Sequence, residues 1–151
     1  IAASYCISVF EDEHTERNPY TEEYESKFPR GAQPFYIPKK IFSVPWMKLI
    51  HRDIIGNRRF NEVFPSGQDA LLMFEISDRM NKVKFTSSDA IYYWRQRSDS
   101  LHRMGLSKLI SKYGRLALAY TGIYLKHPLD YNFIFYFTRV LASCHAILKR
   151  N

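Results

Sequence analysis

The turn Pro65-Ser66-Gly67-Gln68-Asp69 and the apolar run that follows it, Ala70-Leu71-Leu72-Met73-Phe74, organise the rest of the chain. Ser66 with an acid three residues later has the form of a capping box, so the pattern predicts a helix from Asp69 to about Met80 that Ser66 caps. Asp69 then has two interpretations. It is either an acid held at the helix start by the positive end of the dipole, or a carboxylate that the turn delivers to a functional site.

Charge is distributed unevenly along the 151 residues. The net charge is +7, yet residues 1–26 hold seven acids and one base, which leaves 21 bases and 8 acids for the remainder. A basic body of this kind suits nucleic acid, an anionic lipid surface or a phosphate-bearing substrate, and charge alone does not choose among them. The length fits one domain with a hydrophobic core of its own.

Cysteine usage and hydropathy point to the cytoplasm. Cys6 and Cys144 lie in apolar contexts without metal-ligand spacing, so we predict that both are reduced core residues. The apolar runs Leu116–Leu125 and Phe133–Leu148 are too short or are interrupted by polar residues, so neither is predicted to span a membrane. Because the chain begins without an initiator Met and enters an apolar segment at once, we expect it to be a piece of a longer protein.

The spacing of apolar residues and the positions of Gly and Pro predict the other elements of an α/β fragment. They are a strand at Ala2–Phe10, a long irregular connection over 14–40, a helix from Ser43 to Gly56 with Trp46, Leu49, Ile50 and Ile54 on one face, strands at Val83–Phe85 and Ala90–Arg95, and a polar basic loop over 96–103.

Residues 104–151 are predicted to form a C-terminal helical hairpin that follows a first unit at 1–103. Apolar residues keep a helical spacing from Leu106 to Tyr124, and His127-Pro128 ends that helix. Because the aromatic residues of Phe133–Phe137 fall on more than one face, we expect some of them to stay exposed. The apolar positions that mark the second helix are Phe133, Phe137, Val140, Leu141, Cys144, Ile147 and Leu148.

Four motifs, taken in order, carry a resemblance to a known family. They are Trp46-Met47-Lys48-Leu49-Ile50-His51-Arg52, then Phe60, then Gly67-Gln68-Asp69-Ala70-Leu71-Leu72, and then Tyr92-Tyr93-Trp94-Arg95 with Ser100 after it. In this order and spacing the chain from about Ala2 to Arg103 resembles the second half of family 2 glycosyltransferases of the bacterial GT-A type. The corresponding family features are a W-x-K-L helix, a lone Phe, a G-E-D turn that opens a helix, and a Y-Y-x-R strand.

The resemblance implies a catalytic role for Asp69. In that family the acid of the G-E-D turn is the general base that takes the proton of the acceptor hydroxyl while this oxygen attacks the anomeric carbon of a nucleotide sugar, with inversion. Gln68 stands where the family has Glu, which puts any role of a second carboxylate in doubt. Trp46 has two interpretations, stacking on a sugar of the substrate or packing in the core.

The loop after Arg95 is a second candidate region. Arg97, Ser100 and Arg103 would donate to, or neutralise, the leaving nucleotide diphosphate, and His102 would complete a metal shell. The alternative is that all four are exposed loop residues without a ligand. The resemblance implies a divalent metal, Mg or Mn, in the full-length enzyme, but the family's Asp-x-Asp metal motif occurs nowhere in this sequence.

The expected architecture is therefore an α/β fragment with an incomplete GT-A-like sheet and flanking helices, followed by the hairpin. We expect the fragment alone to be inactive and the full-length enzyme to serve polysaccharide biosynthesis. Its partners would be a nucleotide-sugar donor and a glycan or lipid-linked acceptor, at the cytoplasmic face of the membrane.

Two other classes of function stay open. A nucleic-acid binder would explain the basic body, but neither an aromatic RNA-binding strand motif nor a recognition-helix pattern is present, so we expect no nucleic-acid partner. A non-catalytic helical interaction or peripheral membrane module would explain residues 105–150, with basic residues toward lipid headgroups. In that case we expect weak binding to anionic vesicles, or a homo-oligomer formed through Phe133–Phe137.

Overall fold

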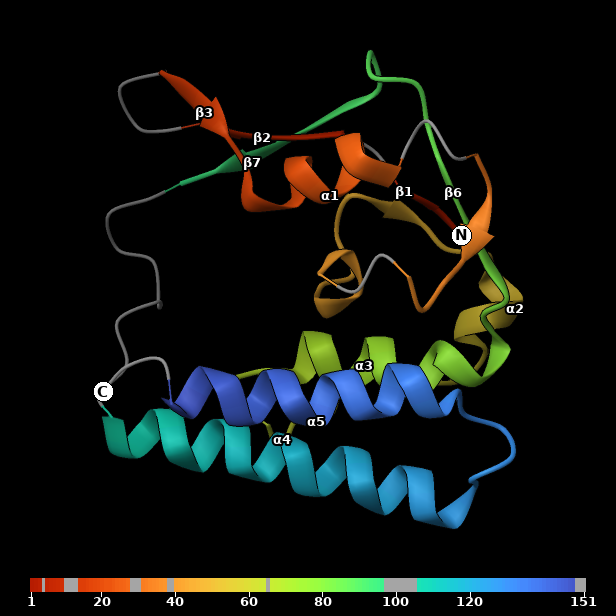
Figure 1. Cartoon of the computed structure of the whole chain (residues 1–151), viewed down its shortest axis with the longest axis vertical. Coiled ribbons are helices and arrows are strands. Elements are labelled where there is room, and N and C mark those ends of the chain that lie inside the picture. Colours follow the sequence, from red (N-terminus) through yellow and green to blue (C-terminus); the bar gives the residue numbers. More distant parts are fainter. Residues whose placement is uncertain are drawn as a thin grey trace.

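The computed structural model describes residues 1–3, 5–9, 14–27, 31–37, 40–64, 66–96 and 106–148. The chain is a mixed α/β structure in which small sheets lie at one end and two long helices at the other, as Figure 1 shows. In chain order the elements are β1 (Ala2–Ala3), β2 (Tyr5–Val9), β3 (Thr15–Arg17), α1 (Pro19–Lys27), β4 (Gln33–Pro34), η2 (Ile41–Ser43), β5 (Lys48–Leu49), α2 (Arg52–Ile55), α3 (Gln68–Glu75), η3 (Ile76–Arg79), β6 (Lys82–Phe85), β7 (Ile91–Arg95), α4 (Leu106–Lys126) and α5 (Phe133–Leu148).

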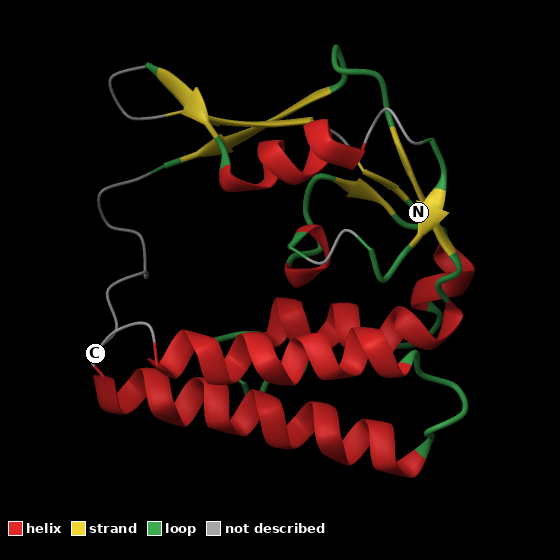
Figure 2. Ribbon diagram, in the orientation of Figure 1, coloured by secondary structure: helices red, strands yellow, loops and turns green. Residues whose placement is uncertain are grey.

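The strands form two small sheets, drawn in yellow in Figure 2. One has the order β4-β6-β1-β5 and the other β3-β2-β7. β1 pairs with β6 and β2 pairs with β7 in parallel, whereas the other pairs are antiparallel. The single predicted strand at 2–10 therefore serves both sheets, as β1 and then as β2. The strands predicted at 83–85 and 90–95 are confirmed as β6 and β7.

Helix α1 lies where the sequence predicted an irregular connection, so that prediction is wrong. The side chain of Asn18 caps the helix by accepting from the amide of Tyr20 at 3.0 Å, and Pro19 occupies the first helical position, where its missing N–H costs nothing. The same Asn18 is buried and donates to Ser8 Oγ of β2 at 3.1 Å. A proline-rich segment thus becomes a helix because one asparagine both caps it and ties it to the sheet.

The helix predicted from Ser43 to Gly56 is also wrong over most of its length. A short helical turn, η2, ends at Ser43, and the chain then bends at residues 45–47, with a positive φ of 54° at Met47, before it enters β5. Strand β5 pairs with β1 by placing Leu49 opposite Ala2. Pairing with a strand far away in the sequence overrides the local helical spacing. Only α2 is helical, and it ends at Gly56 as predicted, with a positive φ of 57°.

The predicted helical hairpin is confirmed as the antiparallel pair α4 and α5. Tyr124 and Tyr136 stack across it with ring centroids 4.2 Å apart. Phe135 of α5 lies in a cluster of aromatic rings with Phe74 of α3 and Phe42 of η2. One apolar core therefore contains residues from both sides of the predicted 103/104 boundary. Among the described residues, no helix combines the length and apolar composition that crossing a membrane requires.

The predicted apolar stripe of α5 is wrong in its direction. Phe135, Arg139 and Ser143, each four residues apart, are the buried positions, whereas Phe133 and Cys144 of the predicted stripe are exposed. The prediction of a core Cys144 is therefore wrong as well. Cys6, in contrast, is buried as predicted, and burial raises the pKa of its thiol to about 11 although the charge of Lys48 opposes the shift.

Candidate functional site

Asp69 lies in the first turn of α3, behind a glycine that the turn requires. Gly67, with a φ of 90°, is the N-cap residue, and its carbonyl accepts from the amide of Leu71 at 3.1 Å. The predicted capping box is wrong, because Gly67 takes the cap position and no side chain bonds to the end of the helix. A Cβ on Gly67 would come within 2.7 Å of Leu116 Cδ1, so α4 packs directly against the turn that carries Asp69.

Asp69 is half-buried, and its charge affects ionisable groups on α4 and α1. Burial lowers the pKa of the Lys112 ammonium on α4, and the charge of Asp69 raises it again. On the other side, burial raises the pKa of the Tyr20 hydroxyl on α1, and the charge of Asp69 adds to the shift. Gln68, the first residue of α3, is also half-buried.

Trp46 belongs to an aromatic cluster that also contains Tyr20. The Trp46 ring meets Tyr20 edge-on, with centroids 5.0 Å apart, and stacks on Tyr92 and Trp94 of β7 at 5.5 and 5.4 Å. Tyr20 therefore contacts Trp46, and among the charges that raise the pKa of its hydroxyl that of Asp69 is a minor one. The observed contacts of Trp46 are those of a half-buried packing residue.

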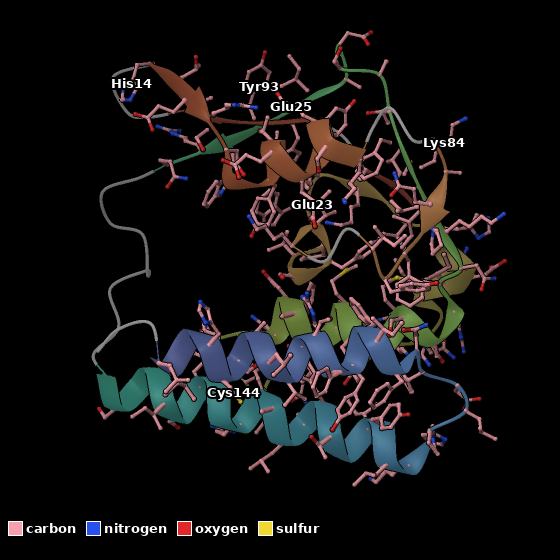
Figure 3. All side chains as sticks on the ribbon, in the orientation of Figure 1. His14, Glu23, Glu25, Lys84, Tyr93 and Cys144 are labelled. Atoms are coloured by element: carbon pink, nitrogen blue, oxygen red, sulfur yellow. The ribbon has the colours of Figure 1, made fainter. Side chains whose placement is uncertain are left out.

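A buried polar cluster lies between α1, η2 and α5, and the sequence did not predict it. Arg139 Nη1 of α5 donates to Ser43 Oγ at 2.8 Å, while the guanidinium lies 5.1 Å from the centre of the Phe135 ring. Glu23 of α1 points toward this region (Figure 3) and accepts from the amide of Ile41 at 2.7 Å. Burial lowers the pKa of Arg139, and nearby Tyr120, Glu23 and Tyr20 oppose the shift.

Lys48 is another cation that burial perturbs, beside Arg139. Its ammonium donates to the carbonyls of Val44 at 2.7 Å and Trp46 at 3.1 Å, and lies 5.8 Å from the centre of the Phe42 ring. Burial lowers the pKa of Lys48 to about 7, although the charges of Glu23 and Cys6 oppose the shift. A group that titrates near neutral pH and lines a cleft is a candidate for function.

A cleft of about 510 Å³ opens between the segment before α2, the end of α2 and one face of α3. Its lining is mostly apolar, with three cationic side chains and no acid among the described residues. Apolar clefts with a few polar groups are the usual form of small-molecule sites. The lining residues are Pro45, Lys48, Leu49, Ile50, Ile55, Arg58, Arg59, Phe60, Leu72, Met73 and Ile76.

The helical spacing connects this cleft with Asp69. Leu72, Met73 and Ile76, which line the cleft, come three, four and seven residues after Asp69. Residues at these spacings share one face of a helix, so Asp69 continues the same face by one turn toward the N-terminus of α3. Asp69 itself is not one of the lining residues. Asp69 therefore lies one turn before the lining residues along the helix, outside the cleft itself.

Four of the residues that the sequence proposed for the site lie outside the described residues: Arg97, Ser100, His102 and Arg103. Within the described part of the chain, no group of three or more His, Cys, Asp or Glu side chains gathers as a divalent cation would require. The divalent metal that the resemblance implies stays a prediction for the full-length enzyme.

The comparisons give no relative for this chain: no family model, no curated protein and no solved structure matches it.

Proposed function

We propose that these residues form the acceptor-side part of an inverting glycosyltransferase, with Asp69 as the general base. The proposal rests on the position of Asp69 in the first turn of α3, one helical turn before Leu72 and Met73, which line the apolar cleft. A base must come within hydrogen-bond reach of the proton that it removes, and an acceptor seated in that cleft would bring a hydroxyl toward Asp69. The resemblance of the Gly67-Gln68-Asp69 turn to the family's G-E-D turn supports the same role.

The reaction requires only one carboxylate from this part of the enzyme. The acceptor oxygen forms a bond to the anomeric carbon as its proton passes to Asp69, and the bond from that carbon to the nucleoside diphosphate breaks with the electron pair leaving on the diphosphate. Attack from the opposite face inverts the configuration. The donor has to be held by a nucleotide-sugar-binding part that these residues do not resemble, so we expect no transfer by residues 1–151 alone.

Charged groups near Asp69 would favour its ionised form. The charge of Asp69 raises the pKa of the Lys112 ammonium on α4 against the effect of burial, so the two opposite charges attract each other. An ionised carboxylate is the form that a general base requires.

The test is the substitution Asp69→Asn in the full-length protein, assayed for transfer from nucleotide sugars and for release of nucleoside diphosphate. Asn keeps the shape of the side chain, so stability should change by no more than about 1 kcal/mol, while loss of the base should lower the rate by ~10²–10⁴-fold. Asp53→Asn is a matched control, because Asp53 is also a first-turn acid and its side chain is 88% exposed.

The two variants separate the interpretations of Asp69. Equal turnover by Asp69→Asn and Asp53→Asn would show that Asp69 is not the base. If Asp69→Asn fails to fold and Asp53→Asn folds, Asp69 is a structural acid at the helix start and the proposal is wrong.

A second candidate function rests on the outer hairpin face, which we define as Leu118 and Leu125 of α4 with Phe133, Phe137, Leu141 and Leu148 of α5. On α5 these positions lie opposite the buried Phe135 and Arg139, and on α4 Leu118 and Leu125 are 74% and 71% exposed. This many exposed large apolar side chains on two neighbouring helices is unusual on an isolated monomer. Because Asp130 is the sole acid in 106–148, the hairpin suits an anionic membrane surface.

This second function predicts binding of the chain to vesicles that contain anionic lipid. Replacing Leu118 and Leu125 together by Gln should weaken cosedimentation with the vesicles at low salt. Val63→Gln is the control, because Val63 is 69% exposed outside the hairpin. Binding that survives Asp69→Ala but is lost with the hairpin variant would support a membrane role separate from catalysis.

A further inference from the structure

We infer that the cleft lined by Lys48, Arg59 and Leu72 binds an amphipathic anion, meaning a molecule with one apolar chain or ring that ends in a phosphate or carboxylate. This binding concerns the chemistry of the cleft, and it would hold whether or not Asp69 is a catalytic base.

The apolar part of such a ligand has walls and a rim to contact. Leu72, Met73 and Ile76 line the cleft on the side of α3. Met73 and Ile76 are buried and form its floor. At the rim of the cleft, the large apolar side chains of Leu49 and Phe60 are 74% and 46% exposed to solvent. A bound chain would remove both from water, and burial of apolar area is the main favourable term in binding of this kind.

The cationic residues of the cleft differ in whether the protein already neutralises them. Arg58 makes a bidentate ion pair with Asp78, with distances of 2.9 and 2.5 Å. Within the described ranges of the chain, in contrast, no carboxylate forms an ion pair with Arg59 or Lys48. Two cations of the cleft are thus left to a ligand, while one is used by the fold.

Arg59 is the better placed of the two for direct contact. Its Nη1 atom donates to the carbonyls of Gly56 at 3.3 Å and Arg58 at 2.8 Å, which holds the exposed guanidinium at the cleft. A guanidinium carries more N–H donors than these two contacts use, and its planar fork matches phosphate and carboxylate groups. The anionic group would therefore meet Arg59 while the apolar part lies along α3.

Lys48 adds a second, partly enclosed charge. Both acceptors of its ammonium, the carbonyls of Val44 and Trp46, are neutral, so the protein compensates its charge incompletely. Burial of the Lys48 ammonium is the main cause of its lowered pKa. An anion in the cleft would favour the charged form and be attracted by it.

Titration calorimetry with monomeric decyl phosphate tests the inference on the whole chain. Decyl glucoside, which has the same apolar chain and no charge, and inorganic phosphate, which has the charge and no chain, should each bind at least about tenfold more weakly. Arg59→Gln and Leu49→Ser should each weaken decyl phosphate binding by about tenfold.

Matched variants assign the effect to the cleft. Arg52→Gln removes an exposed arginine of α2 that does not line the cleft, and Val63→Ser removes an apolar side chain of similar exposure to Leu49. Both variants should bind decyl phosphate within about twofold of the affinity of the unmodified chain.

Equal weakening of decyl phosphate binding by the control variants would show that the ligand binds elsewhere. Binding of decyl glucoside as tight as that of decyl phosphate would refute a role for the cations, and equally tight inorganic phosphate would refute the apolar part.

Discussion

The two faces of α5 reverse the usual relation between polarity and burial. Its inner face buries Arg139 and Ser143 next to Phe135, whereas its outer face exposes Phe133 and Leu141. Arg139 is tolerated inside because Ser43 accepts its hydrogen bond and the Phe135 ring lies against the guanidinium. The difference shows that specific polar partners decide which face of this helix is buried. The apolar outer face is left exposed and could bind another molecule.

Removing Arg139 should give the largest effect on stability. Arg139→Ala deletes the hydrogen bond to Ser43 and the contact with Phe135, and it leaves the half-buried Glu23 with less compensating charge. We expect a loss of about 3 kcal/mol in the free energy of unfolding, measured by urea denaturation. Leu141→Ala on the outer face is the control and should cost less than about 1 kcal/mol. Comparable losses would mean that the outer face is covered in solution.

Two glycines, Gly67 before α3 and Gly122 on α4, differ in how closely other residues pack around them. Gly67 has a φ of 90° and no room for a Cβ beside Leu116, so Gly67→Ala should destabilise the chain by about 2 kcal/mol. Gly122 lies on α4 with no atom within 4 Å of where a Cβ would be, so Gly122→Ala should stabilise it by about 0.5–1 kcal/mol. Thermal unfolding of the two variants measures both signs, and a stabilising Gly67→Ala would contradict the close packing of α4 on the turn.

The parts of the fold that the sequence predicts are those with local causes. The spacing of apolar residues in 106–126 and 133–148 indicates helices, and Gly56 ends α2 because glycine accepts its positive φ. Helix α1 was not predicted because the four prolines of residues 14–40 suggest a loop. The non-helical stretch after Ser43 was not predicted because β5 forms only by pairing with β1. In both cases a distant partner decides the local structure.

The candidate site divides in the same way. The turn at Gly67 places Asp69 at the start of a helix, which the sequence predicted, whereas the cap residue was assigned to Ser66 instead. The cluster of Arg139, Glu23 and Ser43 joins three segments of the chain and has no local pattern. The one signal in the sequence was an arginine in an otherwise apolar helix, with Ser143 four residues after it.

The stability of the chain should depend on pH through the buried ammonium of Lys48, with a smaller effect than those above. Its pKa is lowered to about 7 from 10.5, so between these values the unfolded chain binds more protons than the folded one. The destabilising contribution of the buried ammonium is therefore complete below about pH 7 and fades as the pH rises toward 10. Relative to Lys48→Met, the unmodified chain should gain at least about 1 kcal/mol between pH 6 and pH 9 in urea unfolding. A difference that does not change with pH would show that the ammonium is well solvated.

The smallest expected effect belongs to the outer hairpin face. Leu118 and Leu125 are each more than 70% exposed, so replacing both by Gln removes little buried area from a monomer. The free energy of unfolding should change by no more than about 0.5 kcal/mol. Sedimentation should show the same mass for both proteins if the face meets lipid rather than a second copy of the chain. If the double variant instead loses about 2 kcal/mol or more and sediments as a smaller species, the outer hairpin face is a subunit interface, because only a partner copy in solution would bury these leucines and lend them that much stability.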